Sequence, residues 1–411
     1  MAFYGKITKY SLVPFSLGFS SGLVYLLLAS TLSVYLYEHQ ISLILIGLFA
    51  IRLTPYSYKC LFSPIVESIR LKIFPKNFGQ RRSWLVATQT LIALLIVSLG
   101  LIDPEKQIYI LLILATSTAF IATLHDIAAD GYRIELSPTI LYTNSIHVLG
   151  FRTGLVISGA GSMLLLAFLS WREVFFIVAS LYVPCIFTLI FIAEDHRLIN
   201  NRYTINMCIK WFKAEVIDVV YSLLRLPKFY LSLLIIAFFK VSDTYLDSMY
   251  WIFLLEKGFT KTEIGLVIQT VSTVFNIFGA FLGAFLISRF RTVYYLLIAE
   301  VSAAVTNLLF LLISDANLWI LTCINVVEAT ANGVANVVCI SYMSSLCDKR
   351  FPASCFALLY SISSIIRFNI ATTSGFIVSN YGWDMFFIIS SMLSIPSIIA
   401  ILARYYNDKT K

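Results

Sequence analysis

The fold is decided by the stretch Thr123-Leu-His-Asp-Ile-Ala-Ala-Asp-Gly-Tyr-Arg-Ile-Glu-Leu136, which closes an apolar run that begins near Ile108. A run of this length predicts a helix that crosses a membrane, with the quoted stretch in its cytoplasmic half. Asp126 and Asp130 are four residues apart, so both carboxylates lie on one face of that helix. A charge at bilayer depth costs on the order of 3 kcal/mol, so we expect this face to line protein or water. Either both acids lie near the interface and are simply hydrated, or they form a protonatable pair along a transport pathway.

The composition places the whole chain in a membrane. Of its 411 residues, 59% are hydrophobic and 13% are charged, whereas soluble chains carry about 25% charged residues. We therefore expect an all-α polytopic membrane protein whose first apolar run is a retained helix rather than a cleaved signal. The net charge of +8 belongs mainly to cytoplasmic loops and predicts no nucleic-acid partner. The seven cysteines and four histidines form no CxxC, HExxH or cluster, so no metal site and no cofactor are expected.

Apolar stretches near the length of about 20 residues that crosses a bilayer recur about twelve times. They lie near 11–36, 41–65, 84–102, 108–132, 144–168, 174–193, 229–254, 264–288, 292–314, 316–344, 354–378 and 384–403. A charged break at 194–228 divides them six and six, which is typical of transporters with two similar halves. The predicted domains are an N-terminal six-helix bundle at 1–194, a cytoplasmic linker at 195–228 and a C-terminal six-helix bundle at 229–411.

The distribution of lysine and arginine sets the predicted orientation. With the N-terminus inside, most of the 30 Lys and Arg residues fall in inside segments. The outside loops hold only Lys106, Arg172, Lys257 and Lys261. Because cytoplasmic loops are enriched in basic residues, we expect both termini in the cytoplasm, and an odd number of spans would spoil the asymmetry.

Charges inside the predicted spans follow a period of three spans. Spans four, seven and ten hold five acids: Asp126, Asp130, Asp243, Asp247 and Glu328. Spans two, five and eleven hold four cations: Arg52, Lys59, Arg152 and Arg367. Spans three, six, nine and twelve are nearly free of charge, with Glu300 as the exception. Every third helix is therefore expected to face lipid while the others surround a central cavity, as in the major-facilitator fold with its three-helix repeats.

Two of the inner spans carry polar stripes. Lys240, Asp243 and Asp247 lie at i, i+3 and i+7, so the lysine can pair with an acid on the same face. The other stripe lies at helical spacing in span ten: Asn325, Glu328, Asn332 and Asn336. Amides at this spacing suit hydrogen bonds to sugar or peptide groups and equally suit contacts that join helices, and both interpretations stay open.

Small residues and prolines predict local geometry. Three glycine pairs at four-residue spacing predict close contacts between helices: Gly18 and Gly22, Gly150 and Gly154, Gly279 and Gly283. Pro55 and Pro64 predict a kink in span two, which can serve gating or curvature alone.

With these features in place, the chain resembles the AmpG-type muropeptide permeases. The resemblance is carried, in chain order, by Gly18-Phe-Ser-Ser-Gly22, Lys59-Cys-Leu-Phe-Ser-Pro64, Phe78-Gly-Gln-Arg-Arg82, His125-Asp-Ile-Ala-Ala-Asp130, Gly150-Phe-Arg-Thr-Gly154, Phe239-Lys-Val-Ser-Asp243, Gly258-Phe-Thr-Lys-Thr-Glu-Ile-Gly265, Phe356-Ala-Leu-Leu-Tyr360 and Arg367. These segments span nearly the whole chain, and their order and spacing together are more specific than any one of them.

The resemblance implies a major-facilitator permease, in the branch shared with acetyl-coenzyme A transporters, that imports anhydro-muropeptides on the proton gradient for cell-wall recycling. It implies a location in the bacterial inner membrane. Eight positions match charges typical of the family: Lys59, Asp126, Asp130, Arg152, Lys240, Asp243, Glu328 and Arg367. The chain departs from the family pattern at His125, where Gln is usual, and at Glu67, where Asp is usual. Arg52, Asp247 and Glu300 are not family features, and two C-terminal spans of some members are absent.

These observations lead to predicted roles in alternating access. The candidate proton carriers are Asp126, Asp130, Asp243 and Glu328, because an acid in a closing cavity holds a proton more readily than in water. An anionic substrate is expected to meet Arg152, Arg367 and Lys240, with Asn325, Asn332 and Asn336 as polar contacts. Glu67, Arg81 and Arg82 are candidates for a gating loop after span two, although plain positive-inside signalling explains the arginines equally well.

Rival interpretations differ in solute or in class. The same cations suit acetyl-coenzyme A, a nucleotide or an anionic drug. A membrane-embedded acyltransferase with His125 beside Asp126 is a remote alternative, because no nucleophile, metal motif or soluble catalytic loop accompanies the pair. We therefore expect a monomeric carrier that is not an enzyme and whose partners are protons, a small anionic solute and membrane lipid.

Overall fold

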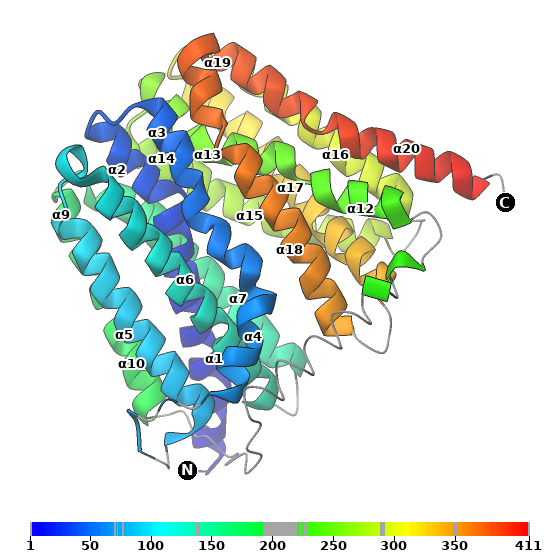
Figure 1. Cartoon of the computed structure of the whole chain (residues 1–411). Helices are drawn as coiled ribbons and strands as arrows, with labels where there is room; N and C mark the ends of the chain where they lie inside the picture. The colour runs from blue at the N-terminus through cyan, green and yellow to red at the C-terminus, as the bar shows by residue number, and fades with distance from the viewer. Residues whose placement is uncertain are drawn as a thin grey trace. The chain divides into compact units, whose positions relative to one another are not determined.

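The computed structural model describes residues 2–69, 71, 73–75, 78–136, 140–191, 220–221, 223–225, 229–287, 292–347 and 352–409. Every regular element in these ranges is a helix (Figure 1). Nine helices of the described part are long and apolar enough to cross a membrane, and 272–287 and 355–371 form shorter apolar helices. The predicted all-α polytopic class is confirmed, while the count of twelve spans and their six-and-six division stay predictions.

The described chain forms two compact units, and the first consists of residues 1–35 and 58–212. Its helices are α1 (Ala2–Leu26), the π-helix η1 (Leu27–Thr31), α4 (Lys59–Ser68), α5 (Gln80–Leu101), α6 (Pro104–Leu136), α7 (Ile140–Val156), the π-helix η4 (Ile157–Gly161), α8 (Ser162–Leu165), α9 (Trp171–Ser180) and α10 (Tyr182–Phe191). The chain leaves this unit within α2 (Leu32–Glu38) and returns to it at residue 58.

The glycines of α1 and α7 let these two helices touch backbone to backbone. A Cβ on Gly18 or Gly22 would overlap a carbonyl oxygen of α7, that of His147 or of Phe151. The same holds in reverse, because a Cβ on Gly150 would overlap the carbonyl oxygen of Phe15. The glycine pairs therefore do what their spacing predicted, which is to bring helices close.

The second unit consists of residues 36–57 and 213–411. Its helices are α3 (Leu43–Leu48), the 3-10 helix η2 (Phe49–Tyr58), α12 (Phe229–Phe238), α13 (Val241–Glu256), α14 (Lys261–Ile264), the π-helix η5 (Gly265–Val271), α15 (Ser272–Ile287), α16 (Thr292–Leu309), the 3-10 helix η6 (Phe310–Leu312), α17 (Leu318–Leu346), α18 (Pro352–Ala371), α19 (Ser374–Met392) and α20 (Ile395–Lys409).

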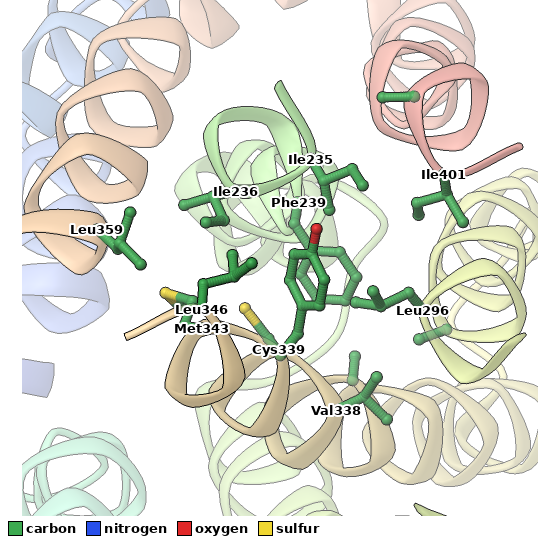
Figure 2. Packing of buried hydrophobic residues seen from close by; sticks show 14 of the residues in the cluster. Ile235, Ile236, Phe239, Leu296, Val338, Cys339, Met343, Leu346, Leu359 and Ile401 are labelled. Atoms are coloured by element: carbon green, nitrogen blue, oxygen red, sulfur yellow. The ribbon is translucent and has the colours of Figure 1, made fainter. Parts of the chain in front are cut away.

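A cluster of buried apolar side chains holds this unit together. Figure 2 shows side chains of α12, α16, α17, α18 and α20 meeting in one place: Ile235, Ile236, Phe239, Leu296, Val338, Cys339, Met343, Leu346, Leu359 and Ile401. Phe239 is 1% exposed and directly precedes Lys240, where the helix is interrupted between α12 and α13. The cluster therefore anchors one side of that break.

Candidate functional site

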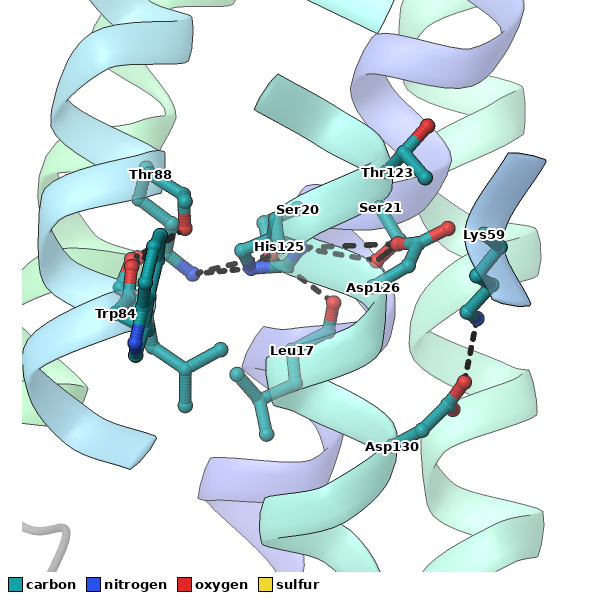
Figure 3. A network of polar contacts seen from close by, with 12 residues as sticks. Leu17, Ser20, Ser21, Lys59, Trp84, Thr88, Thr123, His125, Asp126 and Asp130 are labelled. Carbon is teal, nitrogen blue, oxygen red and sulfur yellow. Dashed lines mark hydrogen bonds and ion pairs between the residues drawn. The ribbon is translucent and has the colours of Figure 1, made fainter. Parts of the chain in front are cut away.

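His125 and Asp126 form the centre of a polar network in the first unit (Figure 3). The Ser21 hydroxyl donates to Asp126 Oδ1 at 2.7 Å and lies 3.4 Å from His125 Nδ1. On the other side of the ring, His125 Nε2 lies 3.2 Å from Ser20 Oγ and 3.3 Å from Gln89 Nε2. The imidazole is fully buried among α1, α5 and α6, so its two nitrogens exchange hydrogen bonds with side chains rather than with water.

Asp130 lies one turn further along α6 and has different partners. Its carboxylate is 2.6 Å from Lys59 Nζ on α4 and 3.1 Å from an Arg133 nitrogen. The side chains of Lys59 and Asp130 are each 38% exposed, so this is a half-exposed ion pair and of modest energy. The two acids of the opening stretch therefore occupy distinct surroundings: Asp126 lies beside a histidine and a hydroxyl, and Asp130 lies between two cations.

The predicted gating loop is described only in part. The Glu67 side chain lies outside the described residues. Gly79, just before α5, has a φ of 81°, which glycine adopts readily. The Arg81 guanidinium lies against Gly131 of α6, and Arg82 donates to the Ile190 carbonyl and stacks 4.2 Å from the centre of the Phe78 ring. Both arginines thus have structural contacts at the start of α5, and their role in gating stays a prediction.

In the second unit, the site is built on a helix that breaks inside a predicted membrane span. Helix α12 ends at Phe238 and α13 begins at Val241, and Lys240 between them has a φ of 64°. A left-handed lysine is strained and marks a position that its surroundings impose. The Lys240 backbone N–H donates to Glu300 Oε1 at 3.2 Å, and Glu300 is 2% exposed. Glu300, the exceptional acid in the predicted outer spans, therefore caps the start of α13.

The Lys240 ammonium lies within a set of acceptors. It donates to Asn332 Oδ1 and to Asn336 Oδ1, both at 2.7 Å, and lies 3.5 Å from Asp243 Oδ2. An ammonium has three N–H donors, so each donor has an acceptor. The predicted pairing of Lys240 with an acid one turn away is confirmed, and two amides of the span-ten stripe share the same cation.

The rest of the stripe on α17 has other contacts. Asn325 is fully buried, accepts from the Tyr250 hydroxyl at 2.9 Å and donates to the Leu321 carbonyl. Glu328 Oε1 accepts from Asn332 Nδ2 at 3.3 Å. Asp247 lies one turn beyond Asp243 on α13 and is exposed. Asn325 therefore joins α13 to α17, whereas Asn332 and Asn336 hold a charge.

The two candidate arginines lie on different units. Arg152 is half-buried on α7, two residues from each of the glycines Gly150 and Gly154 that touch α1. Arg367 is half-buried on α18, where it donates to Ser364 Oγ at 3.1 Å and lies 5.7 Å from the centre of the Tyr360 ring. The role of both arginines as substrate ligands stays a prediction.

Sequence reasoning missed the residues that surround His125. Ser20, Ser21 and Gln89 were not singled out, and the Tyr182 hydroxyl, which donates to the Ser20 carbonyl at 2.7 Å, was not either. One signal was available, because a glutamine in the apolar run at 84–102 is costly in a bilayer unless it has a partner. The partner itself comes from α6, far away in sequence, so no spacing rule finds it.

Two family models match parts of this chain. The model described as Acetyl-coenzyme A transporter 1 matches residues 2–113, and Major Facilitator Superfamily matches residues 232–411. The anhydromuropeptide permease of Escherichia coli (strain K12) is 30% identical over 393 residues, which cover 94% of this chain and 78% of that protein. A protein named putative transporter AmpG 4 of Rickettsia felis is 28% identical over 405 residues, covering 96% of each.

Solved structures with little sequence identity share the fold. The nucleoside transporter NupG superposes with a TM-score of 0.74 at 14% identity, covering 96% of this chain and 99% of that one. A D-xylose-proton symporter superposes with a TM-score of 0.71 at 13% identity, covering 96% of each. The resemblance carried by the sequence motifs is thus confirmed over nearly the whole chain: it belongs to the AmpG-type anhydromuropeptide permeases of the major facilitator superfamily.

Proposed function

We propose that this protein imports anhydro-muropeptides across the bacterial inner membrane by proton-coupled alternating access, as a monomer with both termini in the cytoplasm. The observation that carries the substrate class is the 30% identity to the Escherichia coli anhydromuropeptide permease over 94% of this chain. The protein acts as a carrier rather than an enzyme, and its partners are the solute, protons and lipid.

The proton is assigned to the first unit. Asp126 accepts a hydrogen bond from the Ser21 hydroxyl and has a histidine beside it, whereas Asp130 is paired with both Lys59 and Arg133. Lys59 also acts electrostatically on Asp126, but a carboxylate paired directly with two cations has less reason to take up a proton than one whose hydrogen-bond donor is a hydroxyl. We therefore place Asp126 first among the predicted carriers, with Asp130 holding α4 against α6.

The substrate charge is assigned to arginine and lysine. An anhydro-muropeptide bears lactyl and peptide carboxylates, and guanidinium groups suit a two-point contact with a carboxylate. Arg152 and Arg367 are the candidates for this contact. Lys240 is held by Asn332, Asn336 and Asp243, so a substrate carboxylate reaches it by replacing one of those acceptors. Asp243 and Glu328 are the candidate proton carriers that would change protonation when a substrate carboxylate displaces one of these acceptors.

The experiment measures uptake of a labelled anhydro-muropeptide into vesicles that contain the full chain, with and without an uncoupler. Accumulation that the uncoupler abolishes is expected, and Asp126→Asn should abolish it while folded protein stays in the membrane. Lys106→Gln, on an outer loop paired with Asp103, is the matched control and should transport normally. Accumulation that ignores the uncoupler, or full uptake by Asp126→Asn, contradicts the proposal.

A second candidate solute is acetyl-coenzyme A, which the match of residues 2–113 to the acetyl-coenzyme A transporter model favours. The same vesicles distinguish the two solutes, because each is offered as competitor to the labelled other. Inhibition of muropeptide uptake by unlabelled muropeptide and not by acetyl-coenzyme A supports the first candidate. The reverse pattern of inhibition would instead support acetyl-coenzyme A as the solute.

A further inference from the structure

We propose that His125 shares the transported proton with Asp126 through the Ser21 hydroxyl, and that the Gln89 amide stabilises both charge states of the imidazole. This inference rests on the proposed proton-coupled function and adds His125 to the residues that carry the proton. The family pattern has glutamine where this chain has His125, so the histidine is a feature of this chain and needs an account of its own.

The direction of each hydrogen bond follows from the donors available. The Ser21 hydroxyl has one proton, and Asp126 Oδ1 takes it at 2.7 Å. Ser21 Oγ can then only accept from His125 Nδ1, 3.4 Å away, so this ring nitrogen carries a proton. Imidazole, hydroxyl and carboxylate thus form a chain in which each member donates to the next (Figure 3).

The hydrogen bonds at the opposite edge of the ring indicate the charge state of the His125 imidazole. The Ser20 hydroxyl donates to the Leu17 carbonyl at 2.9 Å, so its oxygen is an acceptor. Gln89 Nε2 has two N–H groups, which point to Ser20 Oγ at 3.1 Å and to His125 Nε2 at 3.3 Å. His125 Nε2 therefore accepts, and the imidazole in this state is neutral with its proton on Nδ1.

One atom of the network lacks a partner in this state. Gln89 is fully buried, and its Oε1 has no hydrogen-bond partner among the described residues. A buried acceptor without a donor costs about 1–3 kcal/mol. Rotation of the amide by half a turn would bring Oε1 to the ring, where it can accept only if Nε2 carries a proton. In that orientation the unsatisfied oxygen gains the Nε2–H donor, and the amide N–H groups give up Ser20 Oγ and His125 Nε2 as acceptors.

The proposed transfer balances in protons. In the imidazolium form both ring nitrogens carry a proton, and Asp126 is ionised. The Nδ1 proton moves to Ser21 Oγ as the Ser21 proton moves to Asp126 Oδ1. The products are a neutral imidazole protonated on Nε2, which donates to Gln89 Oε1, and a neutral Asp126. The pair holds one transported proton in either form, and its negative charge disappears only when that proton is bound.

Few other charged groups reach this ring in the described part of the unit. Asp126 lies 3.7 Å from His125 Nδ1 on the same helix. Lys59 and Arg133 are paired with Asp130, and Lys59 also interacts electrostatically with Asp126. From α10 the Tyr182 hydroxyl contacts the Ser20 carbonyl, and His147 on α7 interacts electrostatically with Asp126 and Asp130. The α1 and α5 side chains that touch the ring are the neutral Ser20, Ser21 and Gln89.

The test compares the pH dependence of uptake in vesicles for the wild type, His125→Gln and the control His39→Gln. Uptake by the wild type is expected to change with pH between about pH 5 and 8. His125→Gln, whose amide forms hydrogen bonds but does not titrate, should lose this change. His39→Gln should keep it. Gln89→Glu, which can only accept, should move the change to higher pH.

The outcomes separate this inference from the proposed function. If Asp126→Asn abolishes uptake while His125→Gln keeps the wild-type pH profile, the histidine has no part and only this inference is overturned. If uptake ignores the uncoupler in every variant, the proposed proton coupling falls. Should His125→Gln fail to transport, nitrogen NMR of histidine-labelled wild type decides. An imidazole whose protonation does not change between about pH 5 and 8 overturns the proposal, and one that titrates supports it.

Discussion

Single residues carry the charge balance of this protein, and Lys240 is the clearest case. Its side chain and that of Asp243 are 12% and 9% exposed, so removing the cation leaves a buried carboxylate without its counter-ion. Lys240→Met is therefore expected to lower the free energy of unfolding by about 3–5 kcal/mol. Chemical unfolding of the purified protein in detergent measures this loss.

A matched substitution and a double variant test the cause. Lys261 pairs with Glu38 at 2.6 Å, but these side chains are 27% and 28% exposed, so Lys261→Met should lose no more than about 1 kcal/mol. Adding Asp243→Asn to Lys240→Met removes the uncompensated charge and should restore part of the stability. Equal losses for the two lysines, or no recovery in the double variant, would rule out a buried ion pair.

At this scale the sequence predicts pairs within one helix and misses pairs between helices. Lys240 and Asp243 are three residues apart, so helical geometry alone places them together. Ser21, Gln89 and Lys59, which contact His125 or Asp130, come from α1, α5 and α4, and no spacing in the sequence relates them to α6. Tertiary packing decides that Asp126 lies beside a histidine while Asp130, four residues later, lies between two cations.

Whole helices meet where side chains are smallest, which makes the contact of α1 with α7 testable. Gly150→Ala would place a Cβ on the Phe15 carbonyl oxygen. Backbone cannot yield as a side chain can, so the helices must separate, and we expect a loss of about 1–3 kcal/mol. The midpoint of thermal unfolding in detergent should fall accordingly.

The control for this prediction lies on the same stretch of chain. Gly161 has a helical φ of −59°, and the nearest atom to an added Cβ is Ile157 Cγ2 at 3.8 Å. Gly161→Ala should therefore be neutral or stabilise by up to about 1 kcal/mol, because alanine loses less backbone entropy. If both alanines behave alike, the close approach at Gly150 does not limit stability.

The bounds and the breaks of helices differ in how well a sequence predicts them. The stretch at 84–102 is helical as its hydropathy predicts, and Pro55 lies in a 3-10 helix where a kink was expected. The breaks at Lys240 and at Gly382, whose φ is 79°, are different cases. Glycine at a predicted loop is an ordinary signal, but lysine gives none, because the Glu300 acceptor that holds its backbone comes from another helix.

For the molecule as a whole, the side of the membrane on which each end lies follows from charge. The predicted outer loops hold four cations, and one of them, Lys106, is already paired with Asp103 at 3.2 Å. Since basic residues concentrate on the cytoplasmic side, we expect both termini inside. Glu105→Cys and Tyr406→Cys each add one thiol to the seven native cysteines, at exposed positions that are predicted to lie on opposite sides of the membrane. A membrane-impermeant maleimide added to intact cells should label the first and label the second only after lysis, with the unsubstituted chain as background. Labelling of both positions from outside would mean an even number of crossings between them, and that would end the six-and-six arrangement on which alternating access depends. Labelling at 406 alone would mean an inverted chain.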